Sequence, residues 1–559
     1  MRRRTTSGSH GSSIVKRVIV TALAAAVLSV QLPAFFGTAA CASGASGELS
    51  GEASGVRMWE AIEKPTESFA DYRVGGAPYG LILSYYDDIY SRGFSWITDH
   101  SVTDSELYIV PEDGGENADF SSTPLITGTY DDKNAAYTSH KVWVSGLLPS
   151  TVYSYKAGSA SGWEYGVFRT ESSTPSTITA IQLSDAQTKD PTKLAVWENT
   201  VAQAVETAGR ELDMILYNGD QYDSNMMGTG AEIDRGVRNA IARETVGEYV
   251  DSVPYMASAG NHEATLPSAG IFVNGFSVDY GAEGDGGYSG INSTPYLYGG
   301  CYSFDYAFAH FSVINANSIL YGDPDQVAWL KDDLAAANSD PDIRWIIVLT
   351  HIGLYATGDH SDLVWDLITT LAPVFSENHV DLVLQAHDHT YSKTLPYTWD
   401  TIGYTTEYNN SDIVNFNVTT VEYDGVTYDL DPNGTYYVTT GAAGHRYGAG
   451  EKGDGIWADL KNDGSSLGES GLYGGMTFTN NLYKVEVGRI TQENSYEPYT
   501  YEGVTADQAY DVGDYASGNV NAPMFGVLTL TRDTLSYDFY TADGDTVKLF
   551  DTLRVMKTD

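Results

Sequence analysis

The sequence predicts an α/β domain with sheets covered by helices, preceded by a smaller all-β sandwich. Buried strands alternate with amphipathic helices between residues 178 and 389, which is typical of α/β folds. Short alternating strands without helical periods occupy residues 77–170, as expected for a sandwich. With 559 residues, 42% of them hydrophobic, the chain is long enough for more than one domain and is not a disordered polymer.

Residues 1–42 have the pattern of a secretory signal peptide. Five basic residues precede the apolar run at 18–30, and small residues at 40–42 form an A-x-A-like cleavage site. An uncleaved anchor is the alternative, but the run is shorter than the ~20 residues of a spanning helix. Lipidation at Cys41 is a weaker alternative. We therefore expect a secreted or extracellular protein with no membrane span in the mature chain, and association with the cell surface stays open.

The next two regions are a linker and the predicted sandwich. Residues 43–74 are small and polar at first and are predicted to be a linker. Residues 75–172 contain the stretches GLILSYY, GFSWITD, SELYIVP, HKVWVSG, TVYSYKAG and YGVFRT, separated by turn residues. Several strands at this spacing predict a small β-sandwich.

Residues 173–559 form the predicted α/β domain. Buried strands are predicted at 178–185, 214–220, 344–351 and 380–389. Helices are predicted at 192–212, after the capping pair Asp323-Pro324, and from Ser361 through Phe375. Residues of about 394–473 are polar and are interpreted as insertions, apart from the strand-like TYYVTTGAAG. The C-terminal segment FGVLTLTRDTLSYDFYTADGDTVKLFDTLRV predicts β-hairpins.

Charge and cysteine content exclude several classes of protein. The formal net charge is −43, and such acidity repels phosphate backbones and anionic membranes, so a nucleic-acid-coating protein is not expected. Phosphate chemistry in this chain needs local positive charge from metal ions or clustered histidines. Two cysteines, Cys41 and Cys301, are too few for a thiolate zinc site.

Metal-capable side chains follow four of the predicted strands. They are Asp185 with Gln187, then Asp220, His351, and His387 with His389; the loop GNHE at 260–263 is a fifth group. Sites in open α/β sheets form beyond the carboxyl ends of strands, so these groups are expected to converge. A single His or Asp after a strand is ordinarily a cap or loop residue, but five such endings are not expected by accident.

The mixture of donors predicts the kind of metal centre. Carboxylate, amide and imidazole ligands without thiolate suit iron, manganese or zinc. Two such ions polarise a phosphoryl group and generate a hydroxide nucleophile, and one carboxylate can bridge them. The sequence therefore predicts a dinuclear centre, with the identity of the metal pair left open.

The ordered blocks SDAQ, NGDQYD, GNHE, VLTH and AHDH resemble those of the purple acid phosphatase branch of the calcineurin-like metallophosphoesterases. HKVWVSGLLPSTVYSYKAG and GVFRT resemble the fibronectin type III-like N-terminal domain of that family, and FGVLTLTRDTLSYDFY resembles its C-terminal strands. The resemblance implies a metallophosphoesterase fold of two mixed sheets flanked by helices, after a fibronectin III-like β-sandwich.

The resemblance also implies roles for individual residues. By position, Asp185 and His389 bind the first metal, Asp220 bridges, and Asn261, His351 and His387 bind the second. His262 contacts phosphate or protonates the leaving group, and His360 is a second substrate-facing histidine. Imidazole suits that task because the departing alkoxide needs a proton. By pattern alone, the alternative for both histidines is an ordinary surface position.

Three positions depart from the pattern of the family. Its iron-binding tyrosine lies three residues after the bridging aspartate, where this chain has Asp223, while Tyr222 stands one residue earlier; both are candidate ligands. Gln187 replaces a histidine or a glycine, and its amide either completes the first metal site or hydrogen-bonds the loop. Lys393 matches an arginine position; it either balances the carboxylates near the site or is solvated, and we favour the solvated position.

The leading hypothesis is a secreted phosphoesterase that cleaves phosphate monoesters through attack by metal-bound hydroxide, as acid phosphatases do. A phosphodiesterase or nucleotidase on the same scaffold is the first alternative, because pocket walls choose the leaving group. A non-catalytic surface binding protein with a relict metal site is the second alternative. The expected partner is a phosphate-ester small molecule, and the oligomeric state stays open.

Overall fold

The computed structural model of the protein describes residues 74–86, 88–132, 137–187, 194–209, 212–222, 235–264, 288–291, 294–297, 300–320, 322–355, 365–389, 391–394, 396, 398–399, 418–444, 483–487, 500–501, 504–505, 523–544 and 546–558. All of them belong to the second of two units, which spans Met58–Asp559. The predicted signal peptide and nearly all of the predicted linker lie outside the described residues.

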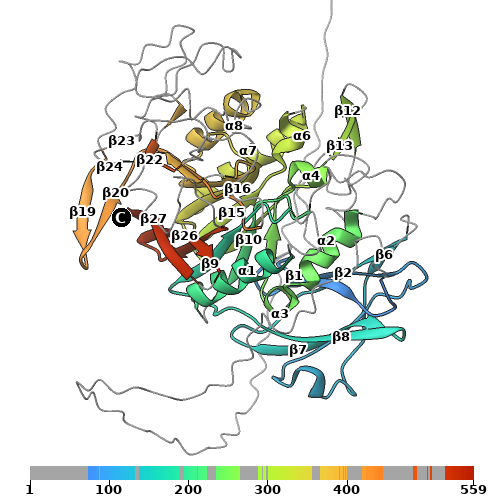
Figure 1. Cartoon of the computed structure of the whole chain (residues 1–559). Helices are drawn as coiled ribbons and strands as arrows, with labels where there is room; N and C mark the ends of the chain where they lie inside the picture. The colour runs from blue at the N-terminus through green and yellow to red at the C-terminus, as the bar shows by residue number, and fades with distance from the viewer. Residues whose placement is uncertain are drawn as a thin grey trace, which may run out of the picture. The chain divides into compact units, whose positions relative to one another are not determined.

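Two antiparallel four-stranded sheets form an N-terminal β-sandwich (Figure 1). The strand orders are β1-β2-β6-β5 and β4-β3-β7-β8. Phe94, Trp96 and Tyr155 belong to the core between the sheets. The strands are β1 (Tyr79–Ser84), β2 (Arg92–Asp99), β3 (Glu106–Val110), β4 (Ile126–Thr127), β5 (Thr129–Asp131), β6 (Tyr137–Val144), β7 (Val152–Ser159) and β8 (Gly162–Arg169). The predicted sandwich is confirmed, and its sheets are consistent with a fibronectin type III-like domain.

The first large mixed sheet joins the start of the α/β domain to the C-terminus. Its order is β11-β10-β9-β25-β26-β27-β20-β19. Strands β9, β10 and β11 run parallel, and β25 pairs antiparallel with β9, so the predicted C-terminal hairpins complete this sheet. The strands are β9 (Ile178–Leu183), β10 (Met214–Tyr217), β11 (Tyr255–Ala257), β19 (Thr420–Tyr423), β20 (Val426–Leu430), β25 (Met524–Leu530), β26 (Thr534–Asp543) and β27 (Thr546–Met556).

The second mixed sheet has the order β14-β15-β16-β17-β21-β18-β22, with β15, β16, β17 and β21 parallel. Along β16, Ile347 and Leu349 belong to the core that also holds residues of the first sheet, while Ile346 and Val348 pack with the helices. The sheet is therefore buried on both faces. Its strands are β14 (Tyr302–Tyr306), β15 (Ala309–Val313), β16 (Trp345–Ile352), β17 (Leu382–Ala386), β18 (Tyr391–Thr394), β21 (Tyr436–Thr439) and β22 (Tyr483–Val487).

Helices cover the two large sheets, as the alternating pattern predicts. Leu330 of α7 and Leu371 of α8 pack on the outer face of the second sheet, whereas Trp197 of α1 joins the core of the first. Asp323 caps α7 by accepting the N–H of Gln326 at 3.1 Å, which confirms the predicted start of this helix. The helices are α1 (Leu194–Ala208), α2 (Arg235–Glu244), α3 (Gly247–Val250), α4 (Asn261–Ala264), α6 (Ala316–Leu320), α7 (Pro324–Ser339) and α8 (Trp365–Glu377).

Part of the segment predicted as a polar insertion is a hairpin of the first sheet. Strands β19 and β20 are joined by the pair Asp424-Gly425, and both residues have positive φ, +51° and +78°. An Asp-Gly pair between alternating strands is a strong hairpin signal, which the polar composition of the segment obscured. Residues 400–417 and 445–473 of the predicted insertion lie outside the described residues.

Buried polar groups fasten the sandwich to the α/β domain. Tyr85, just after β1, packs in the core of the α/β domain, and its hydroxyl donates to Glu171 at 2.6 Å. Arg92 of β2 pairs with the same carboxylate at 2.8 Å. Beside this junction lies a cavity of about 580 Å³, lined by Asp213 and Tyr306 among others, with no predicted site residue in its wall.

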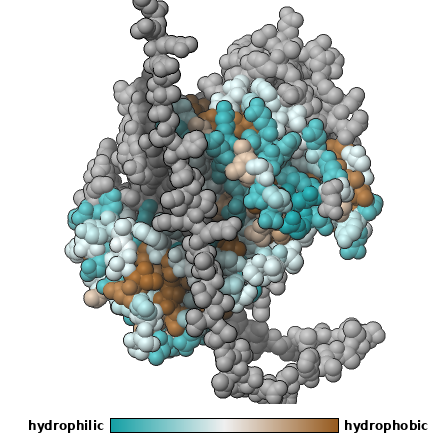
Figure 2. Space-filling model, turned by 180° about the vertical axis from the view of Figure 1, so that it is seen from behind, coloured by the Kyte–Doolittle hydropathy of each residue, from teal (hydrophilic) through white to brown (hydrophobic). Residues whose placement is uncertain are grey.

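The sandwich carries most of the exposed large apolar side chains among the described residues. They are Leu125, Tyr130, Trp143, Leu148 and Tyr165, and the ring of Trp143 stacks on Tyr86 at 5.3 Å between centroids. Figure 2 shows hydrophobic residues gathered at the lower left of the reverse face. No helix in the described ranges is both long and apolar enough to cross a bilayer.

Candidate metal centre

The carboxyl ends of strands from both large sheets supply the predicted metal ligands. Asp185 follows β9 by two residues, Asp220 follows β10 by three, and His387 follows β17 directly. His351 is the last residue but one of β16. Strand ends of neighbouring parallel strands meet at one edge, so side chains far apart in the chain come together there.

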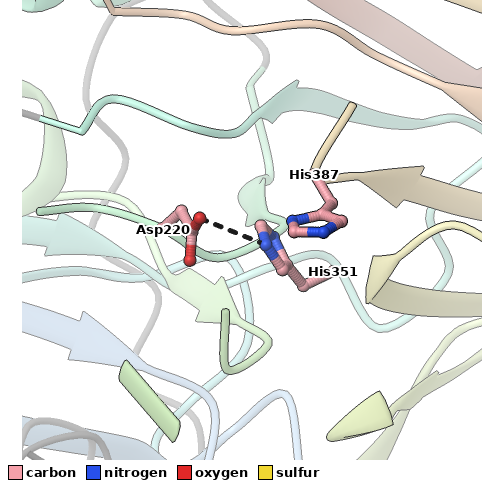
Figure 3. A group of neighbouring side chains, drawn as sticks. All are labelled: Asp220, His351 and His387. Atoms are coloured by element: carbon pink, nitrogen blue, oxygen red, sulfur yellow. Dashed lines mark ion pairs between the residues drawn. The ribbon is translucent and has the colours of Figure 1, made fainter. Parts of the chain in front are cut away.

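Three of these side chains form a cluster that can hold a metal ion. One ligand atom each of Asp220, His351 and His387 lies within 4.8 Å of the other two. Figure 3 shows the carboxylate of Asp220 facing the ring of His351, with His387 behind it; the distance from Asp220 Oδ2 to His351 Nε2 is 3.3 Å. The rings of the two histidines are 5.0 Å apart between centroids.

A backbone carbonyl orients the ring of His351. Its Nδ1 lies 2.6 Å from the carbonyl oxygen of Asn218, which only accepts hydrogen bonds, so Nδ1 carries the proton. The other nitrogen, Nε2, faces Oδ1 of Asn261 at 2.9 Å as well as Asp220. This arrangement leaves Nε2 as the ligand atom, as is usual for metal-binding histidines.

Asn218 positions the site, and sequence reasoning assigned it no role. Its side-chain amide donates to the carbonyls of Thr350 and Leu384, each at 2.8 Å, and accepts from Gln182 at 3.0 Å. These bonds link β9 and β10 of the first sheet to β16 and β17 of the second. The only available signal was its place in NGD, two residues before Asp220.

Glu263, the last residue of GNHE, is a second positioning residue that sequence reasoning missed. Its carboxylate is buried and accepts the backbone N–H groups of Asp220 at 2.8 Å, Gln221 at 2.9 Å and Gly260 at 2.8 Å. It therefore ties the loop that carries Asp220 to the loop that carries Asn261.

Histidines surround the central carboxylate and determine its charge. Burial alone raises the pKa of Asp220, but His262, His351 and His387 hold it well below its usual range. Burial beside Asp220 raises the pKa of Glu263 to about 7. Asp220 is thus an ionised acceptor, the state that a metal ligand requires.

Asp185 and His389 form a second pair of candidate ligands next to His387. Their Oδ1 and Nε2 atoms are 3.5 Å apart, and the N–H of His387 donates to Oδ2 of Asp185 at 3.3 Å. Two buried oxygens, Oδ1 of Asp185 and Oε1 of Gln187, accept no hydrogen bond from the described residues. Buried acceptors without donors are what a bound cation would satisfy, so these residues fit a metal centre.

The backbone at the strand ends is strained. Asp185, Gln187, Asp220 and His387 all have positive φ, at +49°, +36°, +58° and +72°. Residues other than glycine rarely adopt this region, and such strain gathers at functional sites. The strained turns aim these side chains at one point instead of along their strands.

His262 lies beside the centre and is buried, so the alternative of an ordinary surface position is wrong for it. Its N–H donates to Oδ1 of Asp220 at 2.9 Å, and its Nε2 is 3.6 Å from Oδ2. Tyr222 is also buried, and its hydroxyl donates to the carbonyl of His262 at 2.9 Å. An iron ligand would instead be a phenolate, which has no proton to donate.

Three of the residues singled out in the sequence do not belong to the cluster that the structure describes. His360 and Asp223 lie outside the described residues. The expectation that Lys393 is solvated is wrong: it is 1% exposed, its Nζ lies 2.6 Å from Asp551, and it also donates to the carbonyl of Thr552 at 2.6 Å. It belongs to the packing between β18 and β27, where the half-buried carboxylate of Asp551 neutralises it.

Comparison with known families agrees with this geometry. The sequence profile of the calcineurin-like phosphoesterase family matches residues 179–391, which contain all the predicted metal ligands. Over this region the chain is similar to calcineurin-like phosphoesterases, and its curated relatives include purple acid phosphatases. The His/Asp cluster at its strand ends is therefore the expected place of metal ions in a metallophosphoesterase.

The curated relatives of this chain are distant. Over 310 residues it is 25% identical to purple acid phosphatase 22 of Arabidopsis thaliana, covering 55% of this chain and 59% of that protein. It is 27% identical to human acid phosphatase type 7 over 278 residues, covering 46% of this chain and 57% of that protein. It therefore spans less than two thirds of either relative.

A solved structure supports the fold over a longer stretch. The purple acid phosphatase PPD1 from seeds of yellow lupin superposes with a TM-score of 0.53 at 15% identity, covering 86% of this chain and 75% of that structure. A likeness at this identity concerns the fold, namely two mixed sheets with helices after a β-sandwich.

Proposed function

We propose that the protein is a secreted dinuclear-metal phosphoesterase that hydrolyses phosphate monoesters. The observation that carries the proposal is the convergence of Asp220, His351 and His387 on one point at the strand ends. In the proposed assignment, Asp185 and His389 hold one metal ion, Asp220 bridges, and Asn261, His351 and His387 hold the other. Two such ions polarise a phosphoryl group and supply a hydroxide nucleophile near neutral pH.

The chain's own residues solve the electrostatic problem that its acidity poses. A net charge of −43 repels a phosphate ester from the surface as a whole. Four histidines around two carboxylates make the strand ends the place where this repulsion is locally offset, and the metal ions add to the effect.

His262 is the proposed proton donor to the leaving group. It is buried beside the bridging carboxylate, with Nε2 at 3.6 Å from Asp220, so it is close to the phosphoryl position without being one of the assigned ligands. Proton donation from a positioned imidazole typically contributes 10²–10⁴-fold to such reactions. His360 stays a proposal of the same kind.

The alternatives differ in what they predict for substrate. A phosphodiesterase or nucleotidase would use the same ligands with different pocket walls. A non-catalytic binding protein would use the apolar surface of the sandwich. The convergence of Asp220, His351 and His387 argues against this alternative. Secretion is part of the proposal and rests on the N-terminal pattern alone; the mature N-terminus, sequenced from culture medium, should be Ser43, and an intact Met1 on secreted protein would contradict this.

The decisive experiment compares an aryl phosphate monoester with the matching diester across pH, using protein reconstituted with Fe, Mn or Zn. We expect metal-dependent turnover of the monoester, and a loss of at least about 100-fold in His351→Ala. His100→Ala, which removes an exposed histidine of the sandwich, is the matched control and should keep full activity. Preference for the diester would favour the first alternative. Folded protein without turnover on any metal would favour the binding protein.

A further inference from the structure

Gln187 is attached to the bridging aspartate by both its backbone and its side chain. Its backbone N–H donates to the carbonyl of Asp220 at 3.0 Å, and its Nε2 donates to Oδ2 of the same residue at 2.7 Å. The side chain is 2% exposed and follows β9 two residues after Asp185. The amide therefore contacts the carboxylate that is assigned to bridge the metal ions.

The amide oxygen of Gln187 has no partner in the described part of the chain. Oε1 is buried and accepts no hydrogen bond there, and the residue holds a φ of +36°, which a glutamine rarely adopts. A purely structural glutamine would be expected to satisfy both ends of its amide. Strain together with an unpaired acceptor points to a ligand.

We infer that Oε1 of Gln187 is a ligand of the metal ion held by Asp185 and His389. The inference rests on the proposed function, because it assumes that the centre holds metal. The N–H₂ group keeps its hydrogen bond to Asp220, and Oε1, which accepts no hydrogen bond from the described residues, binds the metal ion. One amide can do both, because its oxygen accepts and its nitrogen donates.

Two substitutions separate a ligand from a hydrogen-bond donor. Gln187→Leu keeps the volume and removes both amide atoms. Gln187→Glu keeps an oxygen that can bind metal but removes the donor and places a second negative charge 2.7 Å from Asp220. A ligand role therefore predicts that Gln187→Glu rescues metal binding, whereas a donor role predicts that it is at least as damaging as Gln187→Leu.

The experiment titrates the metal-free full-length protein with Mn²⁺ and Zn²⁺, and measures bound metal per chain by elemental analysis. Gln221→Ala is the matched control, because Gln221 is a buried glutamine of the neighbouring loop after β10, and its amide donates to Tyr255 at 3.0 Å instead of to Asp220. We expect two ions in wild type and in the control, about tenfold or greater weakening of one site in Gln187→Leu, and affinity within about threefold of wild type in Gln187→Glu.

Two results would overturn the inference. Wild-type affinity for both ions in Gln187→Leu would show that the amide is not a ligand, and equal loss in both Gln187 variants would assign it a donor role. A different result would contradict the proposed function: wild-type protein that binds two ions but hydrolyses no phosphate ester. That result would not change the assignment of Gln187 as a ligand. Wild-type protein that binds no metal would overturn both.

Discussion

At the scale of single residues, Glu263 acts on the metal centre through backbone atoms alone. Its two carboxylate oxygens accept three N–H groups, from Asp220, Gln221 and Gly260. A glutamine at this position has one acceptor oxygen, and its N–H₂ group would face N–H donors. The loop that carries the bridging carboxylate is then no longer held.

We expect Glu263→Gln to weaken metal binding by about 10- to 100-fold, the range seen when partners of metal ligands are lost. Metal content after dialysis against a weak chelator measures the effect. Glu248→Gln, which changes an exposed carboxylate of α3, should retain the metal. Unchanged metal content in Glu263→Gln would show that the three hydrogen bonds do not position the centre.

Tyr222 is a candidate iron ligand for which the structure indicates a different role. It stands one residue before the position of the family's iron-binding tyrosine, and its hydroxyl donates to the carbonyl of His262 at 2.9 Å. This hydrogen bond connects the loop that carries Asp220 to the loop GNHE.

We expect Tyr222→Phe to leave the visible absorption of iron-loaded protein unchanged, since the hydroxyl of Tyr222 is directed at the carbonyl of His262. The loss of one buried hydrogen bond should instead lower the free energy of unfolding by about 1–3 kcal/mol. Absorption spectra and thermal melts of the two proteins test both parts. Disappearance of a visible band in Tyr222→Phe would restore the ligand assignment.

At the scale of elements, close contact between two loops makes the centre. The loop after β10 and the loop after β11 touch at Gly260, where an added Cβ would lie 2.1 Å from Oδ1 of Asp220 and 2.3 Å from its nitrogen. These atoms belong to a ligand and its backbone, so they cannot move aside without displacing the bridge.

We expect Gly260→Ala to fold with reduced stability and to lose at least about 100-fold in metal affinity, because the bridging carboxylate must shift. Gly247→Ala is the matched control, since an added Cβ there meets nothing within 4 Å. Metal titration of both variants is the measurement. Retention of wild-type affinity in Gly260→Ala would mean that the loops adapt without moving Asp220.

The elements themselves were largely predictable from the sequence. Strands β9, β10, β16 and β17, helices α1, α7 and α8, and the C-terminal hairpins follow the periodicity of their apolar residues. The hairpin β19–β20 was missed because its alternating residues are mostly exposed and lie in a segment of polar composition. Hydrophobic periodicity is strongest in buried elements, and an exposed hairpin contributes few residues to the core.

At the scale of the whole molecule, stability depends on pH through a histidine far from the centre. His140 lies in the sandwich with its ring stacked on Trp96, and its two nitrogens contact Thr98 at 2.7 Å and Ser105 at 2.8 Å. Burial lowers its pKa from 6.5 to about 4. Between these values the unfolded chain binds the proton and the folded chain does not, so stability falls as pH falls.

The fold should therefore lose up to about 3 kcal/mol from His140 between pH 6.5 and pH 4. Chemical denaturation at pH 4.5 and 7.5 measures the difference, which His140→Gln should reduce because glutamine does not titrate. His100→Gln, at an exposed position of the same domain, should leave it unchanged. An equal pH dependence in wild type and His140→Gln would assign the effect to other groups.

By itself, the sequence determined where the main strands of the α/β domain lie along the chain and which chemical groups follow them, because periodicity and strand-end residues are local properties. Tertiary structure decided which partners those groups have. Asn218 joins both sheets, and Glu263 accepts hydrogen bonds from the loop that carries Asp220. Gln187 donates to Asp220, and Lys393 is buried against Asp551. Several of these contacts join residues more than 100 positions apart, such as Asn218 with Thr350 and Lys393 with Thr552. No local pattern encodes such pairs, since they depend on how the two sheets pack against each other.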